Sequence, residues 1–284
     1  MPYSNWLMHG QDEVDSDVIE ECFQAFEAYN FYWRKSEHDF ATICRALPYN
    51  DDVLREYVLE NPEVCLHPLR FFTLLGAGKI SLLDPLYGIL LLGRGKVSVA
   101  TIEVLLEYSP TDVLRLHNHC FGYPIHIASG AAALDVVRLL LNLDPSTVRE
   151  SDCTGWLPLH HACASQQSEE VILEVLKSYP DALAFAEYDT GRMPLHWACV
   201  RQSSVSLILE LLGRFPEAAR QPDKDGCLPL HLACRFQSSR EVGAGIRDTY
   251  PEALDRANND GKVPLDLRPT WISLRREHKK KRLI

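Results

Sequence analysis

The sequence lacks the features of a membrane, secreted or nucleic-acid-binding protein. Its most apolar stretch, residues 71–92, contains Lys79, Asp84 and Pro85, so we expect it to be buried core, because a bilayer span needs about 20 mostly apolar residues. The opening MPYSNWLMHG has neither a basic nor an apolar segment and does not resemble a secretory signal. Lys and Arg number 29 against 39 Asp and Glu. Nucleic acid is therefore not expected as the main ligand, since phosphate binding draws on clustered basic residues.

Cysteine pairs and catalytic motifs are also missing. The nine cysteines are dispersed and none forms a CxxC pair, which suits a reducing compartment and predicts a cytoplasmic location, with the nucleus as the alternative. Residues 88–97 fail the phosphate-loop pattern because Leu90 stands where the pattern needs Gly and Val97 lacks a hydroxyl. No GxSxG, HExxH or GxGxxG motif is present. We therefore expect no enzyme activity, cofactor, metal or small-molecule substrate; an enzyme within residues 1–117 is the alternative left open.

A repeat with a period near 35 residues organises the chain. Related segments PIHIAS, PLHHAC, PLHWAC, PLHLAC and PLDL begin at Pro124, Pro158, Pro194, Pro229 and Pro264. Successive prolines are 34, 36, 35 and 35 residues apart. A second proline keeps the same step, in segments such as YPDAL and YPEAL. Two independent marks at one period indicate a repeat architecture.

Each repeat is predicted to form two short antiparallel helices. A glycine lies three positions before the first proline and is typical of a turn with positive φ. The proline then begins the first helix, in which Leu159, Ala162 and Cys163 would bury one face. The second helix ends before the second proline. Serines are placed to cap that helix at Ser168, Ser204 and Ser239. One such pair cannot bury its apolar face alone, so the repeats must stack into a solenoid.

The pattern Asp-x-x-Gly-x-x-Pro-Leu-His-x-Ala, followed by an amphipathic helix, resembles the ankyrin repeat. The resemblance implies an all-α, ankyrin-like solenoid of helical hairpins with β-hairpin-type loops between repeats. Three features depart from the family: the step is longer, a Tyr-Pro-Glu-Ala-Leu closure replaces Gly-Ala-Asp-Val-Asn, and apolar residues replace the Thr before the first proline. These replacements exclude the family's Thr–His hydrogen bond; they are Leu157, Met193, Leu228 and Val263.

The strength of the resemblance varies along the chain and predicts four parts. These are residues 1–36, an acidic N-terminal segment with an amphipathic capping helix; 37–117, degenerate helical repeats; 118–274, ankyrin-like repeats; and 275–284, a basic C-terminal tail. A docking helix is the alternative interpretation of the first part. Within the degenerate part, residues 51–65 and 102–114 resemble second helices.

The recurring histidines and cysteines are interpreted as scaffold. A catalyst needs one base and not four copies, so we expect buried hydrogen-bonding roles for His126, His160, His196 and His231. Equivalent helices pack about 8–10 Å apart, too far for a disulfide, so we expect free thiols at Cys163, Cys199 and Cys234. Zinc-competent side chains also cluster at Cys153, His160, His161 and Cys163. His160 and Cys163 are expected to be buried in the core of the repeats, so no metal site is expected.

The resemblance also implies a binding surface on the hairpins and first helices. Ankyrin repeats contact partners through residues beside the turn glycine and after the alanines of the first helix. Carried over by position, this implies the partner-binding residues Thr154, Trp156, Asp189, Arg192, Arg201, Lys224, Asp225, Arg235 and Phe236. Trp and Arg are enriched among binding hot spots. Packing of Trp156 on the neighbouring hairpin is the alternative for that residue.

We therefore expect a non-catalytic interaction module, a scaffold or adaptor that binds another protein through this concave face. Arginines beside aspartates on the face favour charge steering toward a protein epitope. The alternative is a nuclear regulatory protein directed by the basic tail, which carries six basic residues against one acidic residue. A solvated terminus is a further interpretation of that tail. Neither a membrane nor a nucleic acid is the expected partner.

Overall fold

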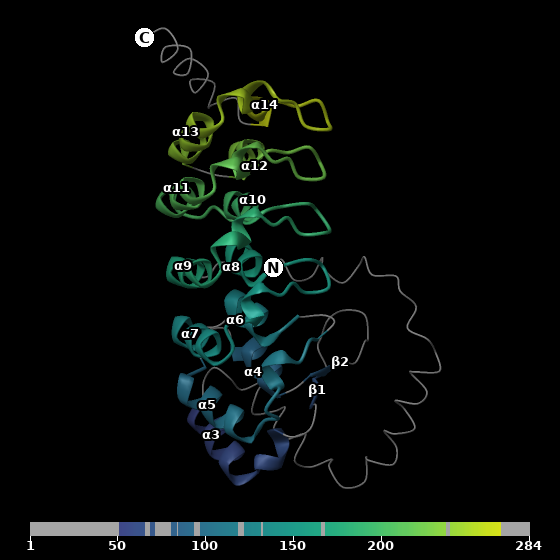
Figure 1. Cartoon of the computed structure of the whole chain (residues 1–284), viewed down its shortest axis with the longest axis vertical. Helices are drawn as coiled ribbons and strands as arrows, with labels where there is room; N and C mark the ends of the chain where they lie inside the picture. Colours follow the sequence, from purple (N-terminus) through teal and green to yellow (C-terminus); the bar gives the residue numbers. More distant parts are fainter. Residues whose placement is uncertain are drawn as a thin grey trace, which may run out of the picture. The chain divides into compact units, whose positions relative to one another are not determined.

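The computed structural model describes residues 51–65, 69–71, 81–83, 85–93, 97–118, 122–131, 133–165, 168–236 and 239–267. The chain divides into two compact units, Met1–Val113 and Leu114–Ile284, whose elements are drawn in Figure 1. The expected N-terminal capping helix and the basic tail lie outside the described residues. The division of the chain into four parts stays a prediction.

The described part of the first unit contains helices and one short antiparallel strand pair. Its elements are α3 (Asp51–Glu60), η1 (Pro62–Cys65), β1 (Leu69–Phe71), β2 (Ser81–Leu83), α4 (Pro85–Gly93) and α5 (Val99–Tyr108), where η denotes a 3-10 helix. Leu69 pairs with Leu83, and α3 packs against α5. The sequence patterns did not predict the strands, which are the only addition to the expected all-α class among the described residues.

The apolar stretch that begins at residue 71 contributes core in its described part. Leu86, Ile89 and Leu90 of α4 are buried, as expected. None of the helices in the described part of the chain has the length and apolar character that crossing a bilayer requires.

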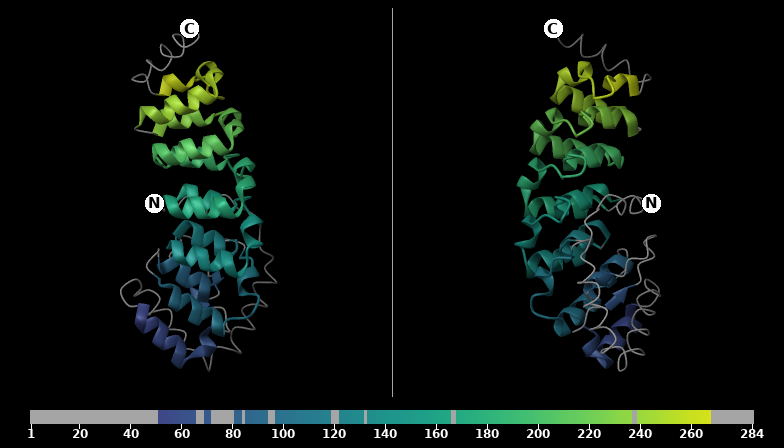
Figure 2. Two further views of the ribbon diagram at one scale, coloured as in Figure 1. Left: turned by 60° about the vertical axis from the view of Figure 1, so that its left-hand side comes forward. Right: turned by 90° about the vertical axis from the view of Figure 1, so that its right-hand side faces the viewer.

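The second unit is a series of helix pairs (Figures 1 and 2). After η2 (Val113–Arg115), the inner helices are α6 (Pro124–Ala131), α8 (Pro158–Ala164), α10 (Pro194–Val200), α12 (Pro229–Phe236) and α14 (Pro264–Leu267). The outer helices are α7 (Leu134–Leu143), α9 (Glu169–Ser178), α11 (Val205–Arg214) and α13 (Arg240–Thr249). Each outer helix leads to a 3-10 helix: η3 (Thr147–Arg149), η4 (Pro180–Ala184), η5 (Pro216–Arg220) and η6 (Pro251–Asp255).

The repeats stack in one direction, as the period predicted. Each inner helix packs on the next, from α6 to α14, and every one of them begins at a repeat proline. In the outer layer α7 packs against α9 and α11 against α13, whereas α9 and α11 approach each other less closely. The predicted solenoid of helical hairpins is therefore confirmed.

The glycine turns are confirmed as well. Gly155, Gly191, Gly226 and Gly261 have φ values of 80, 70, 73 and 74°, a region that residues with a Cβ rarely adopt. At Gly226 a Cβ would also lie 2.9 Å from the backbone nitrogen of Asn259 in the next hairpin. Glycine there serves both the turn and the close approach of two hairpins.

Two of the three predicted serine caps form. The Ser204 hydroxyl accepts the Leu207 N–H, and the Ser239 hydroxyl accepts the Glu241 N–H. Ser168 is the N-cap residue of α9 but makes no cap bond. The expectation of a serine cap is therefore wrong at this position.

The four repeat histidines, His126, His160, His196 and His231, cap the inner helices. His160 Nδ1 accepts the N–H of Leu157 at 3.1 Å, and the other three make the same bond at 3.0–3.2 Å. Because Nδ1 is an acceptor, Nε2 carries the proton, and in His160 it donates to the Phe185 carbonyl at 3.0 Å. The imidazole thus ties the helix start to the following loop without a threonine.

Burial keeps these imidazoles neutral. Desolvation lowers the pKa of His126 to about 3 and those of His160 and His196 to about 4. It also lowers the pKa of His231. The interpretation of the repeat histidines as buried scaffold groups is confirmed.

Candidate functional site

The hairpin loops are closed by a polar side chain at their first position. In the loop from Asp152 to Trp156, the Asp152 N–H donates to the Trp156 carbonyl at 2.9 Å. The Asp152 Oδ1 atom accepts the backbone N–H groups of Thr154 and Trp156, each at 2.9 Å. Asp223 and Asn258 close the later loops in the same way. Such aspartate and asparagine turns fix the loop before any partner binds.

The loop between Glu187 and Arg192 has one residue more than the others and a longer acid at its start. The Glu187 carboxylate accepts the N–H groups of Asp189 at 2.7 Å, Thr190 at 3.0 Å and Arg192 at 3.2 Å. Glutamate has one methylene more than aspartate, which lets its carboxylate serve the longer loop. The extra residue accounts for the 36-residue step to Pro194.

Backbone hydrogen bonds join each hairpin to the next. The N–H groups of Tyr188, Lys224 and Asn259 donate to the carbonyls of Thr154, Thr190 and Asp225 at 2.9, 2.8 and 3.0 Å. With the equivalent Cys153, the three donors form a row of exposed side chains, which we call the tip column: Cys153, Tyr188, Lys224 and Asn259. Figure 1 shows these hairpins projecting on the same side of the helices.

A seam of packed rings lies behind the tips. The ring of Trp156 lies 4.8 Å from that of Trp197 and 5.0 Å from that of His161, which in turn lies 5.5 Å from His126. The guanidinium of Arg192 lies 5.2 Å from the Trp197 ring centroid. We call these five residues the aromatic seam. It connects three consecutive repeats through side chains 30 and more residues apart.

Two acids anchor the aromatic seam. Asp223 Oδ2 lies 3.1 Å from Arg192 Nε, and Asp152 Oδ2 lies 2.9 Å from His161 Nε2. Burial of Asp152 opposes its ionisation, but hydrogen bonds from His161, Thr154 and the Trp156 backbone hold its pKa well below the usual range. The carboxylate is therefore charged at neutral pH and fixed in place.

Trp156 is buried, unlike the surface position that the binding-site prediction implied, whereas Arg192 is half-buried. Trp156 is only 3% exposed, because the residue after the turn glycine points toward the inner helices and packs on Trp197 of the next repeat. The Arg192 side chain is 18% exposed and is held by Asp223 and Trp197. The packing alternative describes Trp156 better than a surface role does.

The other candidate residues remain accessible to different degrees. Exposed side chains belong to Asp189, Lys224, Asp225 and Arg235, and half-buried ones to Thr154, Arg201 and Phe236. The guanidinium of Arg235 lies 5.2 Å from the Phe236 ring centroid. Whether these residues bind a partner stays a prediction.

The sequence argument missed Tyr188, Trp197 and His161. Tyr188 is 64% exposed; counting back two positions from Gly191 passed over it, because this loop has an extra residue. Two features of the sequence could have identified Tyr188: the glutamate at position 187 and the 36-residue step to Pro194. Trp197 and His161 occupy the variable position of the PLHxAC motif, and spacing alone does not show that this position faces the hairpins.

The cysteines and the suspected zinc ligands do not gather around a common point. Cys163, Cys199 and Cys234 are buried and form no disulfide, as expected, and burial raises the pKa of Cys163 to about 12. Cys153 is exposed, and both ring nitrogens of His160 are hydrogen-bonded. Within the described ranges, no three His, Cys, Asp or Glu residues could hold one metal ion together.

Comparison with known proteins agrees with this architecture. Residues 94–186 match the family model of ankyrin repeats (3 copies), and no curated protein matches the sequence. A solved structure described as the Bd0816 predatory endopeptidase from Bdellovibrio bacteriovorus in complex with immunity protein Bd3460 contains a chain of similar fold. The TM-score is 0.53 at 17% identity, with 63% of this chain and 89% of that chain covered. The matched residues and the stacked helix pairs show that the chain contains ankyrin repeats.

Proposed function

We propose that the protein is a non-catalytic interaction module that binds another protein through the tip column and the adjoining inner helices. The observation that carries the proposal is the tip column itself. Its backbone is held in register by hydrogen bonds between hairpins, while its side chains stay exposed. A scaffold or adaptor role follows from a surface of this kind with no catalytic motif in the sequence.

Rigidity of the face favours binding. A surface that is ordered before association loses less conformational entropy when the partner docks. The aromatic seam and the buried Glu187 carboxylate fix the hairpins from behind. Trp156 and Arg192 would therefore support the face from within, while the exposed side chains make the contacts.

The chemistry of the exposed side chains favours a protein epitope of mixed charge. Tyr188 offers a large aromatic side chain, a type enriched at interfaces. Exposed Asp189 and Asp225 carry negative charge and exposed Lys224 carries positive charge on the hairpins, and Arg235 adds an exposed positive charge near the end of α12. Interspersed charges select a complementary partner and speed its approach. The solved structure of similar fold is itself described as an endopeptidase in complex with an immunity protein.

Affinity enrichment with a double variant tests the proposal. Tyr188→Ala combined with Asp189→Lys removes the aromatic contact and reverses one charge without altering the backbone bonds. The matched control is Lys177→Glu on α9, whose side chain is 80% exposed and lies outside the face. We expect quantitative mass spectrometry to show that the double variant enriches specific partners at least about tenfold less than the unmodified protein does. The control should enrich them to the same extent as the unmodified protein. Equal enrichment by both proteins would show that another surface binds.

The cytoplasmic location and its nuclear alternative rest on sequence composition. We propose that the protein is cytoplasmic. The six basic residues of the C-terminal tail favour the alternative, which is entry into the nucleus. A reporter fused to residues 273–284, compared with the same segment carrying alanine at Lys279–Arg282, separates the two. Nuclear accumulation of the first reporter alone would favour the nuclear regulator.

A further inference from the structure

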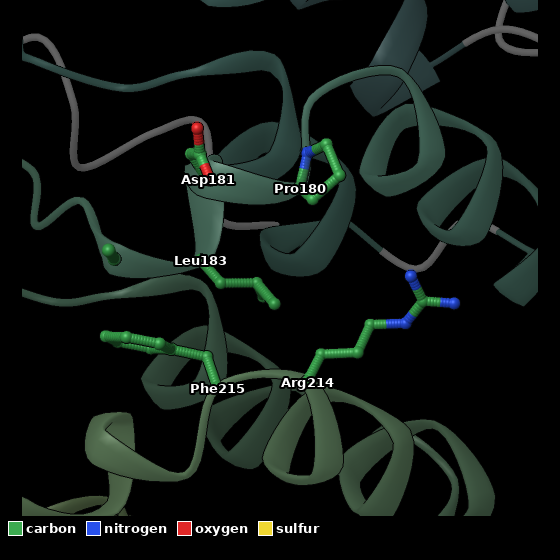
Figure 3. A pocket seen from close by; sticks show the side chains of 6 residues that line it. Pro180, Asp181, Leu183, Arg214 and Phe215 are labelled. Carbon is green, nitrogen blue, oxygen red and sulfur yellow. The ribbon is translucent and has the colours of Figure 1, made fainter.

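The outer layer of the second unit has a pocket between η4 and α11. It has a volume of about 330 Å³ and is lined by Pro180, Asp181, Leu183, Ala184, Arg214 and Phe215. Figure 3 shows Arg214 and Phe215 along one edge, with Leu183 facing them and Pro180 and Asp181 beyond it. The pocket lies where α9 and α11 approach each other less closely than the neighbouring outer helices do.

Neighbouring repeats show what occupies the equivalent place. Arg149 ends η3, and its guanidinium lies 5.5 Å from the ring centroid of Tyr179, the C-cap of α9. Arg220 ends η5, and its guanidinium lies 5.2 Å from the ring centroid of Tyr250, the C-cap of α13. In both cases an arginine from one repeat covers the aromatic residue that ends the next outer helix.

An acid completes the arrangement in one of these repeats. Arg220 Nε lies 3.6 Å from the carboxylate of Glu217, the second residue of the same 3-10 helix. The guanidinium is therefore placed between an aromatic ring and a carboxylate, two groups that attract it by cation–π and ionic interactions.

The repeat that lies between these two has the equivalent aromatic residue and the equivalent acid but lacks the arginine. Here η4 ends at Ala184, its second residue is Asp181, and the C-cap of α11 is Phe215. Within the part of the chain that the structure describes, no cation lies over the Phe215 ring, and no ion pair involves Asp181. The short side chain of Ala184 leaves open the space that an arginine takes in the repeats on either side.

Arg214 does not fill this role. Its Nε atom lies 2.7 Å from the Glu210 carboxylate on the preceding turn of α11, so its charge is already paired. Counted together, Asp181, Arg214 and Glu210 give the pocket and its edge one negative charge in excess. A positively charged guest is therefore favoured over a negatively charged one.

We propose that this pocket binds an arginine side chain of a partner protein, with the guanidinium over the Phe215 ring and beside the Asp181 carboxylate. Arginine fits better than lysine, because its planar guanidinium stacks on a ring and pairs with a carboxylate at the same time. None of the six lining residues belongs to the tip column. The pocket is thus a second contact site, beyond the face proposed above.

A titration followed by NMR tests the site with a defined probe. N-acetyl-arginine amide is added to the full chain, and N-acetyl-citrulline amide, which keeps the shape but lacks the charge, serves as the matched probe. We expect saturable shifts of the Leu183 and Phe215 backbone amides with arginine and an affinity at least about fivefold lower with citrulline. Asp181→Asn and Phe215→Leu should each weaken binding at least about threefold. Equal affinity for the two probes would overturn the proposal.

A variant that supplies the arginine from within provides the second test. Ala184→Arg recreates the pattern of the adjacent repeats and should reduce binding of the arginine probe at least about fivefold. Ala186→Arg is the control, since it adds the same charge at an exposed position two residues away, outside the pocket lining. Equal probe binding by the two variants, or stronger binding of N-acetyl-glutamate amide than of the arginine probe, would refute the assignment. Tyr188→Ala should leave probe binding unchanged, which separates this site from the tip column.

Discussion

Alanine at three turn glycines measures how much the stacking of hairpins contributes to stability. Gly191, Gly226 and Gly261 share φ values of 70, 73 and 74°, so alanine meets the same backbone strain at each. Their surroundings differ. A Cβ at Gly261 has no neighbour within 4 Å, one at Gly191 lies 3.3 Å from the Lys224 nitrogen, and one at Gly226 lies 2.9 Å from the Asn259 nitrogen.

The magnitudes follow from these distances. The left-handed conformation costs a residue with a Cβ about 1–2 kcal/mol, which is the whole effect expected for Gly261→Ala. At Gly226 the new methyl group also displaces Asn259, whose backbone and side-chain N–H groups donate to the Asp225 and Lys224 carbonyls at 3.0 and 2.9 Å. Each such bond contributes about 1 kcal/mol. We expect a loss of about 3–4 kcal/mol for Gly226→Ala and an intermediate loss for Gly191→Ala.

Urea unfolding followed by circular dichroism gives the free energy of unfolding of each variant. Hydrogen exchange of residues 258–267 reports separately on the terminal described repeat, which holds Gly261. The expected order of destabilisation is Gly226, then Gly191, then Gly261. Equal losses at all three positions would show that contact between hairpins adds nothing to the backbone strain. They would refute the account of the tip column as hairpins held in register by hydrogen bonds between them.

Further predictions concern the buried groups. Lowering the pH from 7.5 to 5.5 should destabilise the fold by about 1.4 kcal/mol per deeply buried repeat histidine, because the unfolded chain takes up protons near pH 6.5 while the folded pKa values are about 3 to 4. This stability is fully present above about pH 6.5 and declines toward pH 4; a flat urea midpoint across that range would contradict the assignment of neutral imidazoles. Trp156→Ala should lower the free energy of unfolding by about 3–5 kcal/mol, because its ring is buried in the aromatic seam, and a loss below about 1 kcal/mol would place the ring at the surface. Glu187→Asp should cost about 1–2 kcal/mol in the same assay, since the shorter acid cannot reach all three N–H donors of the longer loop; an unchanged midpoint would argue against that loop closure. In thiol labelling mapped by mass spectrometry, exposed Cys153 should react in the folded protein, whereas Cys163, with a pKa raised to about 12 by burial, should react only after unfolding.

Much of the fold was predictable because it depends on local chemistry. A glycine turn, a proline that begins a helix, an amphipathic second helix and a second proline each act within a few residues. Their recurrence at one period requires the pairs to stack, since no pair can bury its apolar face alone. The capping role of the repeat histidines is equally local, because His160 bonds to a backbone group three residues away.

Which side chains are available to a partner was decided by tertiary contacts. Trp156 and Arg192 were expected at the surface, but they pack against Trp197 and Asp223, which belong to the following repeats. Tyr188 is exposed in the tip column, although the extra residue of its loop places it three positions before Gly191 instead of two. Neither outcome follows from the positions within a single repeat.

The pocket beside Phe215 also depends partly on features visible in the sequence and partly on tertiary contacts. The alanine at position 184 and the arginines at 149 and 220 are visible in the sequence, but only the stacked structure brings each into line with an aromatic residue 30 or 31 positions later. Local hydrogen bonds and periodicity determine the repeat unit, because they act along the chain. The surface a partner would meet depends on distances between side chains of neighbouring repeats, and these exist only after the units have stacked.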